Sequence, residues 1–330
     1  MQFRTEIPLH ESLYKITHNH NIMGFGSCFI DSIGEKLETS KFRIHRNPFG
    51  TLFHPLAIET ALARILSLTY YTEDEIFKFG ELHFSWDHHT SFNRISLNET
   101  LNAINSQLEV ANDFIQKTDI FLLTFGTSMV YKIKEMDLIV ANCHKVPASQ
   151  FQKTLLTELQ LKNSIKNCFN LILDINPKAK IITTISPVRH LKDGFIENNW
   201  SKSRLINALH EVSSQFAQVD YFPAYEIMMD DLRDYRFYKE DHIHPNDLAI
   251  QYIWEKFSSV YFEEKTLEKI KITQKIISSL AHRPLNPESL AYKEFLFKTK
   301  KQIEQAESLF PKNSFHHEKE TLEKLIHHVD

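Results

Sequence analysis

Short apolar runs alternate with amphipathic stretches from His20 onward, which is the pattern of a parallel sheet covered by helices on both faces. The third predicted strand contains the unbroken apolar run IFLLTF, which is typical of a strand buried on both faces and therefore of the sheet centre. The pattern predicts strands at 21–26, 42–46, within 119–131, 180–185 and 219–222. It predicts helices directly after Ser27, at 55–66, 101–115, 150–173 and 203–216, and from Pro245.

Two stretches break this alternation. Residues 68–96 mix aromatic, acidic and histidine residues without a helical period, which predicts an inserted segment of short strands and loops. Beyond Phe262, charged amphipathic segments predict two or three helices that carry no chemistry of their own. We therefore expect an N-terminal segment at 1–19, an α/β domain at 20–262 and a helical extension at 263–330.

Composition and charge narrow the classes of function. Of the 330 residues, 42% are hydrophobic and 24% are charged, which is typical of a globular protein. The net charge of −4 provides no basic field for nucleic acid or an anionic membrane, so a small-molecule partner is favoured. The odd cysteines Cys28, Cys143 and Cys168 argue against a disulfide framework. Without a signal-like or membrane-spanning apolar run, we expect a cytoplasmic protein that does not enter a membrane.

Ser27 follows the first predicted strand, where the chain passes into a helix. In such sheets, ligands bind at the carboxyl ends of the strands. Unpaired backbone N–H groups surround a serine in this position, and they can hold the oxyanion that forms when its hydroxyl attacks a carbonyl. Ser27 is therefore a candidate nucleophile. The structural alternative is that it only caps the helix.

A base for Ser27 is offered by the segment Asp241-His242-Ile243-His244. A serine hydroxyl becomes nucleophilic when a neutral imidazole takes its proton and a carboxylate holds the other ring nitrogen. We expect Asp241 to reach His244 across the turn. We also expect His244 at the N-cap of the next helix, where the helix dipole disfavours the imidazolium. The alternative is a surface loop whose acids and histidines are only solvated.

The chain resembles the bacterial GSCFA-domain family through several motifs that occur in order. They are Gly26-Ser27-Cys28-Phe29, Asn47-Pro48-Phe49-Gly50, Ser85-Trp86-Asp87-His88-His89, Asn142-Cys143-His144-Lys145-Val146-Pro147 and Ser186-Pro187-Val188-Arg189-His190. This family belongs to the SGNH, or GDSL-like, hydrolases, and the resemblance covers about residues 20 to 260. It implies a three-layer α/β/α, flavodoxin-like fold with a five-stranded parallel sheet, here followed by C-terminal helices.

The same resemblance implies roles for individual residues. By the SGNH pattern, Ser27 is the nucleophile, and Asp241 and His244 form the Asp-x-x-His pair that completes the triad. The family's oxyanion hole uses the serine N–H, a glycine N–H and an asparagine side chain. The resemblance implies that Gly50 is that glycine. Ser128 stands where the asparagine is usual, so we expect the side-chain donor to be Ser128 or Asn142.

The histidines of these motifs have two interpretations. By type they suit a zinc or iron centre, but scattered histidines are more often polar groups of loops, and we expect neither a metal nor another cofactor. The motif residues can instead line the substrate pocket. We therefore expect His88, His89 and His144 to bind substrate, and Arg189 to meet an anionic group.

These features predict a serine-dependent hydrolase that acts on an ester bond. It would be an esterase or O-acyl transferase, with a small or carbohydrate ester as substrate and an acyl-Ser27 intermediate. The rival hypothesis is a non-catalytic module that binds a small molecule or carbohydrate on the same fold, which the replacement of the asparagine by Ser128 suggests. A metal-dependent hydrolase is a third, weaker hypothesis.

Overall fold

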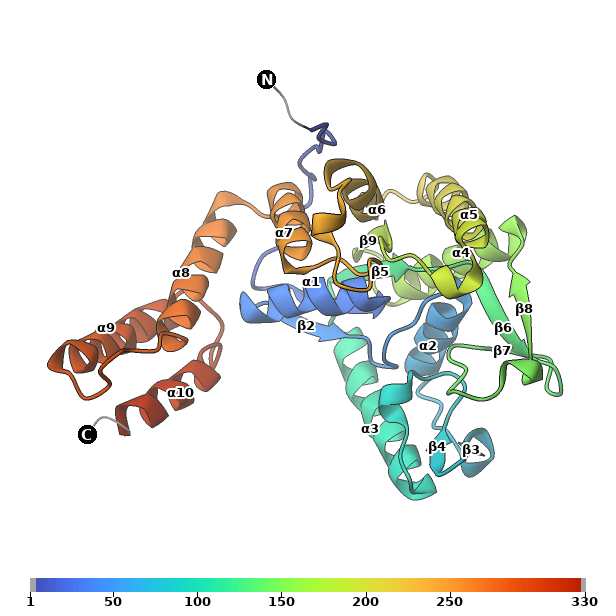
Figure 1. Ribbon diagram of the computed structural model, residues 1–330, viewed down its shortest axis with the longest axis horizontal. Helices are drawn as coiled ribbons and strands as arrows, with labels where there is room; N and C mark the ends of the chain where they lie inside the picture. The colour runs from blue at the N-terminus through green and yellow to red at the C-terminus, as the bar shows by residue number, and fades with distance from the viewer. Residues whose placement is uncertain (1–3, 328–330) are drawn as a thin grey trace. The chain divides into compact units, whose positions relative to one another are not determined.

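The computed structural model describes residues 4–327, and its main sheet has five strands in the order β10-β9-β5-β1-β2 (Figure 1). β1 pairs with β5, β5 with β9 and β9 with β10, all in parallel. The predicted α/β class is therefore confirmed, with the IFLLTF strand at the sheet centre. The strands are β1 (Asn21–Gly26), β2 (Arg43–Arg46), β5 (Ile120–Phe125), β9 (Lys180–Ile185) and β10 (Val219–Tyr221).

Helices cover both faces of this sheet. On one face, α2, α3, α4 and α5 share a single apolar core with alternate side chains of the strands, such as Phe25 and Phe121. The helix α1 lies on the other face. Its Ile30 side chain approaches Gly24 of β1 so closely that a Cβ atom on Gly24 would be 2.7 Å from Ile30 Cγ2. Residues of α7 also pack there, with Phe257 edge-on against Phe222 after β10. These helices are α1 (Cys28–Thr39), α2 (Pro55–Ser67), α3 (Leu97–Ile115), α4 (Glu158–Ile175), α5 (Phe195–Ser213) and α7 (Asp247–Tyr261).

Two small antiparallel sheets are added to this frame. The insertion forms the hairpin of β3 (Phe77–Phe79) and β4 (Leu82–Phe84), in agreement with the short strands expected there. A second sheet, in the order β7-β6-β8, was not predicted. It contains β6 (Met129–Ile133), β7 (Leu138–Val140) and β8 (Phe151–Leu155).

Four predicted helix starts were wrong. The helix expected at 203–216 spans Phe195–Ser213, and the helix expected at 101–115 begins at Leu97. The helix expected from residue 150 begins at Glu158, because residues 151–155 pair with β6 and a capping box between Thr157 and Gln160 starts the helix. The helix expected from Pro245 begins at Asp247, and Asn246 caps it by accepting a hydrogen bond from the Ala249 N–H at 3.1 Å. His244 therefore does not occupy the N-cap.

The described residues divide into two compact units, 4–10 with 21–34 and 44–257, and 11–20 with 35–43 and 258–327. The first unit also contains α6 (Ala224–Glu226) and a π-helical turn, Ile227–Asp231. The second unit contains α8 (Glu264–Leu280), α9 (Leu290–Glu307) and α10 (His316–His327), which confirm the predicted C-terminal helices and share an apolar cluster of their own. Every candidate site residue named above lies in the first unit.

Candidate active site

Ser27 lies where the strand order of the sheet reverses. β2 lies on one side of β1 and β5 on the other, so the loops after β1 and β5 diverge and leave a crevice at the carboxyl edge. Gly26 ends β1 with a φ of +143°, and a Cβ there would collide with the Thr124 carbonyl oxygen. Only glycine fits this turn, which brings Ser27 to the start of α1. The Ser27 hydroxyl accepts a hydrogen bond from the Phe29 N–H at 3.3 Å, and Ser27 is 1% exposed.

Asp241 and His244 form the contact that their spacing predicts. The Nδ1 atom of His244 lies 2.6 Å from Asp241 Oδ2, and Asp241 Oδ1 accepts the backbone N–H groups of Ile243 and His244, each at 2.9 Å. These hydrogen bonds, led by those from His244, hold the pKa of the Asp241 carboxyl well below its usual range. The carboxylate is therefore ionised, and it orients the imidazole through Nδ1.

Ser27 and His244 line the same cavity of about 570 Å³, although they lie more than 200 positions apart in the sequence. Among the residues described, no hydrogen bond joins the Ser27 hydroxyl to the His244 ring. The His244 side chain is 44% exposed, so its ring has room to turn. Hydrogen bonds between a nucleophile and its base often form or shorten only when substrate is bound.

Two predicted oxyanion donors are engaged elsewhere, which corrects both predictions. The Gly50 N–H donates to Asn47 O at 2.7 Å and closes a turn, and Gly50 does not line the cavity. The Ser128 side chain is fully buried, and its hydroxyl donates to Ser201 O at 3.0 Å. Neither group is free to meet an oxyanion in this structure.

Asn142, the third predicted donor, does line the cavity. Its side-chain oxygen accepts the His144 N–H at 2.9 Å, while its amide nitrogen has no partner within residues 4–327. The backbone N–H group of Thr51, which also lies on the cavity, has no hydrogen-bond partner in the described part of the chain. Sequence reasoning missed Thr51, although it directly follows Gly50. Donors for a developing negative charge are thus available on this cavity.

His88 and His144 belong to the protein core, which corrects their prediction as substrate-binding residues. His88 stacks on Phe49 and His144 stacks on Phe84, each with ring centroids 4.2 Å apart, and neither lines the cavity. Burial lowers the pKa of His88 to about 3 and that of His144 to about 4, so both rings are neutral near pH 7. His89, in contrast, does line the cavity, as predicted.

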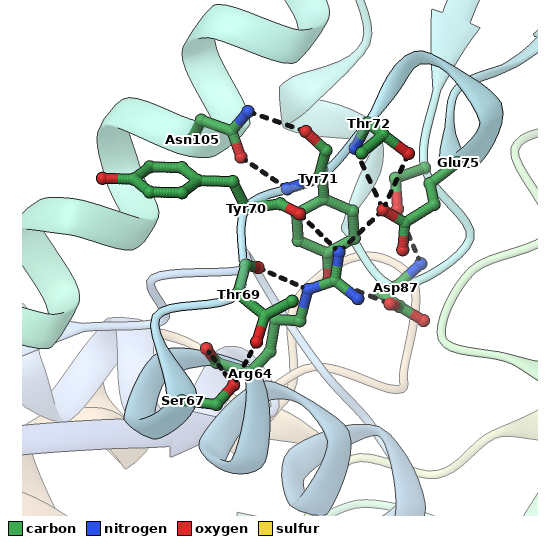
Figure 2. Close-up of polar contacts among 10 residues, drawn as sticks. Arg64, Ser67, Thr69, Tyr70, Tyr71, Thr72, Glu75, Asp87 and Asn105 are labelled. Atoms are coloured by element: carbon green, nitrogen blue, oxygen red, sulfur yellow. Dashed lines mark hydrogen bonds and ion pairs between the residues drawn. The ribbon is translucent and has the colours of Figure 1, made fainter.

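A polar network anchors the insertion that carries His89 (Figure 2). The Arg64 guanidinium lies 3.8 Å from the ring centroid of Tyr71 and donates to Glu75 Oε2 at 2.8 Å. The Tyr71 hydroxyl donates to Asp87 Oδ2 at 2.9 Å, two residues before His89. Because Asp87 is fixed in this way, the network determines how the insertion approaches the cavity.

Arg189 and His190 line the cavity beside the end of β9. The Nε atom of Arg189 and the Nε2 atom of His190 are buried without a hydrogen-bond partner among the described residues. Burial lowers the pKa of His190 to about 4. Behind them, the fully buried Lys202 donates to Ser186 O at 2.6 Å, and burial lowers its pKa to about 7. Sequence reasoning missed Lys202, because a lysine in the polar run NNWSKSR gives no sign of burial.

The described residues contain neither a metal-binding cluster nor a membrane-spanning helix. Within 4–327, no group of three or more His, Cys, Asp and Glu side chains is arranged to hold a metal ion. No helix in that part of the chain is both long enough and apolar enough to cross a bilayer.

Comparison with known proteins identifies the family. Residues 21–257 match the model of the GSCFA family, and residues 273–328 match that of the GSCFA domain protein, C-terminal domain. The chain therefore belongs to the GSCFA family, as its motifs predicted. No curated protein matches the chain.

Three solved structures are similar to the chain at low identity. A carbohydrate esterase family 3 protein from Talaromyces cellulolyticus is 11% identical, with a TM-score of 0.37 and coverage of 76% of this chain and 98% of the other. The acetyl xylan esterase Est2A from Butyrivibrio proteoclasticus is 8% identical, with a TM-score of 0.38 and coverage of 77% and 64%. A Streptococcus pneumonia structure whose description refers to platelet activating factor is 11% identical, with a TM-score of 0.39 and coverage of 75% and 86%.

Proposed function

We propose that this protein is a serine-dependent hydrolase of ester bonds that works through an acyl-Ser27 intermediate. The observation that carries the proposal is that Ser27 and His244 line one cavity, while the His244 ring is hydrogen-bonded to Asp241 through Nδ1. A hydroxyl, an imidazole and an ionised carboxylate are the three groups that activated serine chemistry requires.

The proposed reaction has two halves. His244 Nε2 takes the proton of the Ser27 hydroxyl as Oγ attacks the ester carbonyl, and the same proton then passes to the departing alcohol. Water or an acceptor alcohol next attacks the acyl-serine and loses its proton to His244. As the acyl–Oγ bond breaks, His244 returns that proton to Ser27 Oγ, and the acyl group leaves as an acid or a new ester. Asp241 holds the ring tautomer and stabilises the imidazolium in both halves. The amide of Asn142 and the N–H of Thr51, with that of Ser27, would stabilise the oxyanion.

A small or carbohydrate ester is the substrate class that we propose. The cavity volume, about 570 Å³, lies within the usual range for small-molecule sites. His89 and Arg189 line it and would bind the alcohol part of the ester. We place this chemistry in residues 20–262 and assign none to the helical extension at 263–330.

A second candidate function is a binding module without turnover. Two observations favour it: no hydrogen bond joins Ser27 to His244 in the described residues, and the Ser128 hydroxyl is occupied by Ser201. Such a module would bind the same class of ligand in the same cavity, but it would have no reactive serine.

Labelling with a fluorophosphonate separates these two functions. A hydrolase is expected to be modified covalently at Ser27, with complete loss of labelling in Ser27→Ala. His244→Ala should lower labelling and ester turnover by several orders of magnitude. His242→Ala is the matched control, since within residues 4–327 no hydrogen bond joins the His242 ring to the Asp241 carboxylate, and it should have a much smaller effect. Absence of labelling in the wild-type protein, or equal effects of the two histidine variants, would refute the proposed triad.

A further inference from the structure

A second cavity, of about 750 Å³, adjoins the one that contains Ser27. Arg189 and Leu191 line both cavities, so the two spaces meet at these side chains. An ester bound at Ser27 therefore has room for its alcohol part to extend past Arg189.

Arg189 has no anionic partner within residues 4–327. Its Nε atom is buried without a hydrogen-bond acceptor, and Nη2 donates to the Met229 sulfur at 3.2 Å. A thioether is a weak acceptor, so it leaves most of the hydrogen-bonding capacity of the guanidinium unused. A planar fork of donors with a buried, unused N–H is suited to a carboxylate.

The other charged groups on the second cavity are already paired. Asp241 is hydrogen-bonded to the His244 ring at 2.6 Å, and Asp234 accepts a hydrogen bond from Arg236 at 3.1 Å. Arg233, the other arginine on this cavity, forms an ion pair with Asp230. Among the described residues, neither carboxylate on this cavity is therefore spare for Arg189.

Lys202 adds positive charge near Arg189, and no carboxylate within residues 4–327 is paired with it. Lys202 is fully buried, and its Nζ donates only to a backbone carbonyl, that of Ser186. Burial lowers the pKa of Lys202 to about 7, and the positive charges of Lys202 and Arg189 repel each other. An anion in front of Arg189 would be attracted by both groups.

Exposed aromatic rings lie on the same cavity. Tyr235 is 77% exposed and Phe195 is 68% exposed, and Tyr238 lies beside Tyr235 with ring centroids 6.2 Å apart. Exposed aromatic side chains next to a concave site mark a binding surface, and their flat faces suit the apolar face of a sugar ring.

We propose that Arg189 binds a carboxylate on the alcohol part of the substrate, and that the substrate is an O-acylated acidic sugar lying across the two cavities. This inference rests on the proposed hydrolase function for the ester bond, but the binding of the acidic sugar itself does not require turnover. The second cavity would then select the substrate, and the first cavity would contain the reacting groups.

Binding to the Ser27→Ala protein tests the inference without catalysis. Isothermal titration with methyl glucuronide and with methyl glucoside should show at least about tenfold tighter binding of the glucuronide, the order expected for one charge-assisted bidentate contact. Arg189→Gln should abolish this preference, and Arg189→Lys should retain part of it because the charge remains. Arg233→Gln is the matched control, and it should keep the preference because its guanidinium is already paired with Asp230.

The outcomes separate the inference from the proposed function. Equal binding of the two sugars, absence of measurable binding, or an unchanged preference in Arg189→Gln would overturn the inference. Tighter binding of a glucose phosphate than of the glucuronide would overturn the carboxylate assignment. With the wild-type protein, Ser27-dependent hydrolysis of a simple aryl acetate together with equal sugar binding would retain the hydrolase and reject the acidic sugar. Selective glucuronide binding without any fluorophosphonate labelling would retain the acidic sugar as ligand and reject the hydrolase.

Discussion

Replacing Lys202 with methionine should stabilise the protein, and more at pH 7 than at pH 9.5. Lys202 is fully buried with one hydrogen bond, to Ser186 O, and burial lowers its pKa from 10.5 to about 7. Methionine has a similar shape without the charge. The variant therefore removes an unfavourable buried charge and leaves the packing of α5 largely intact.

The magnitude follows from the two pKa values. A base whose pKa is lowered on folding destabilises the native state fully at pH values below 7, where both states are protonated. The penalty declines between pH 7 and 10.5, and it vanishes above 10.5. At about 1.4 kcal/mol per pKa unit, it is about 4 kcal/mol at pH 7 and about 1 kcal/mol at pH 9.5. Leaving the Ser186 carbonyl without its donor costs about 1–3 kcal/mol at either pH. The expected net gain is therefore about 2 kcal/mol at pH 7 and close to zero at pH 9.5.

Urea denaturation of the wild-type protein and Lys202→Met at both pH values measures this effect. The difference in unfolding free energy between the two proteins should change by about 3 kcal/mol from pH 7 to pH 9.5, whatever the lost hydrogen bond costs. Lys166→Met, at an exposed position of α4, is the control and should show no such change. A difference that is the same at both pH values would refute the assignment of a buried, destabilising charge to Lys202.

Three other substitutions test how the catalytic cavity is built. In urea denaturation, Gly26→Ala should lower the unfolding free energy by about 3 kcal/mol or more, whereas Gly80→Ala should lower it by about 1 kcal/mol. Both glycines have a positive φ, but only a Cβ at Gly26 would collide with backbone. Equal losses in the two variants would contradict this explanation. Asp241→Asn should lower kcat/KM for an aryl acetate about 10³-fold or more, since the His244 ring loses its orienting carboxylate, and a loss below about tenfold would argue against the triad. Asn142→Ala should lower kcat about 10²-fold with little change in KM; a change in KM alone would make Asn142 a ground-state binding residue.

The sequence predicted the sheet well because its strands have strong local signals. The run IFLLTF is apolar throughout, and β5 is buried at every position. The sheet of β6, β7 and β8 lacks such a signal. In β8, Phe151 is buried while the next three residues are exposed, so its stability comes from pairing with β6. The capping box between Thr157 and Gln160 was the local signal that would have moved the start of the helix to its true place.

The candidate site could be predicted only where one short segment contains the contact. Asp241 and His244 are three positions apart, so their hydrogen bond is decided by a single turn. Ser128 is occupied by Ser201, which lies 73 positions further along the chain, and no local pattern reveals that partner. His88 illustrates the same limit, because it stacks on Phe49 in the core while the next residue of the motif, His89, lines the cavity.

The buried Lys202 and the half-buried Arg189 connect the stability of this protein with its proposed specificity. A buried lysine that costs about 4 kcal/mol at pH 7 destabilises a chain whose net stability is of the order of 5–15 kcal/mol. Lys202 and Arg189 both lack a carboxylate partner among the described residues, and Arg189 opens onto both cavities. An anion bound at Arg189 would raise the pKa of Lys202 back toward its ordinary value, and it would remove part of that cost. Ligand-free protein is therefore destabilised by the same charges that would select an acidic substrate, which is the trade-off expected of a binding site that is assembled before its ligand arrives.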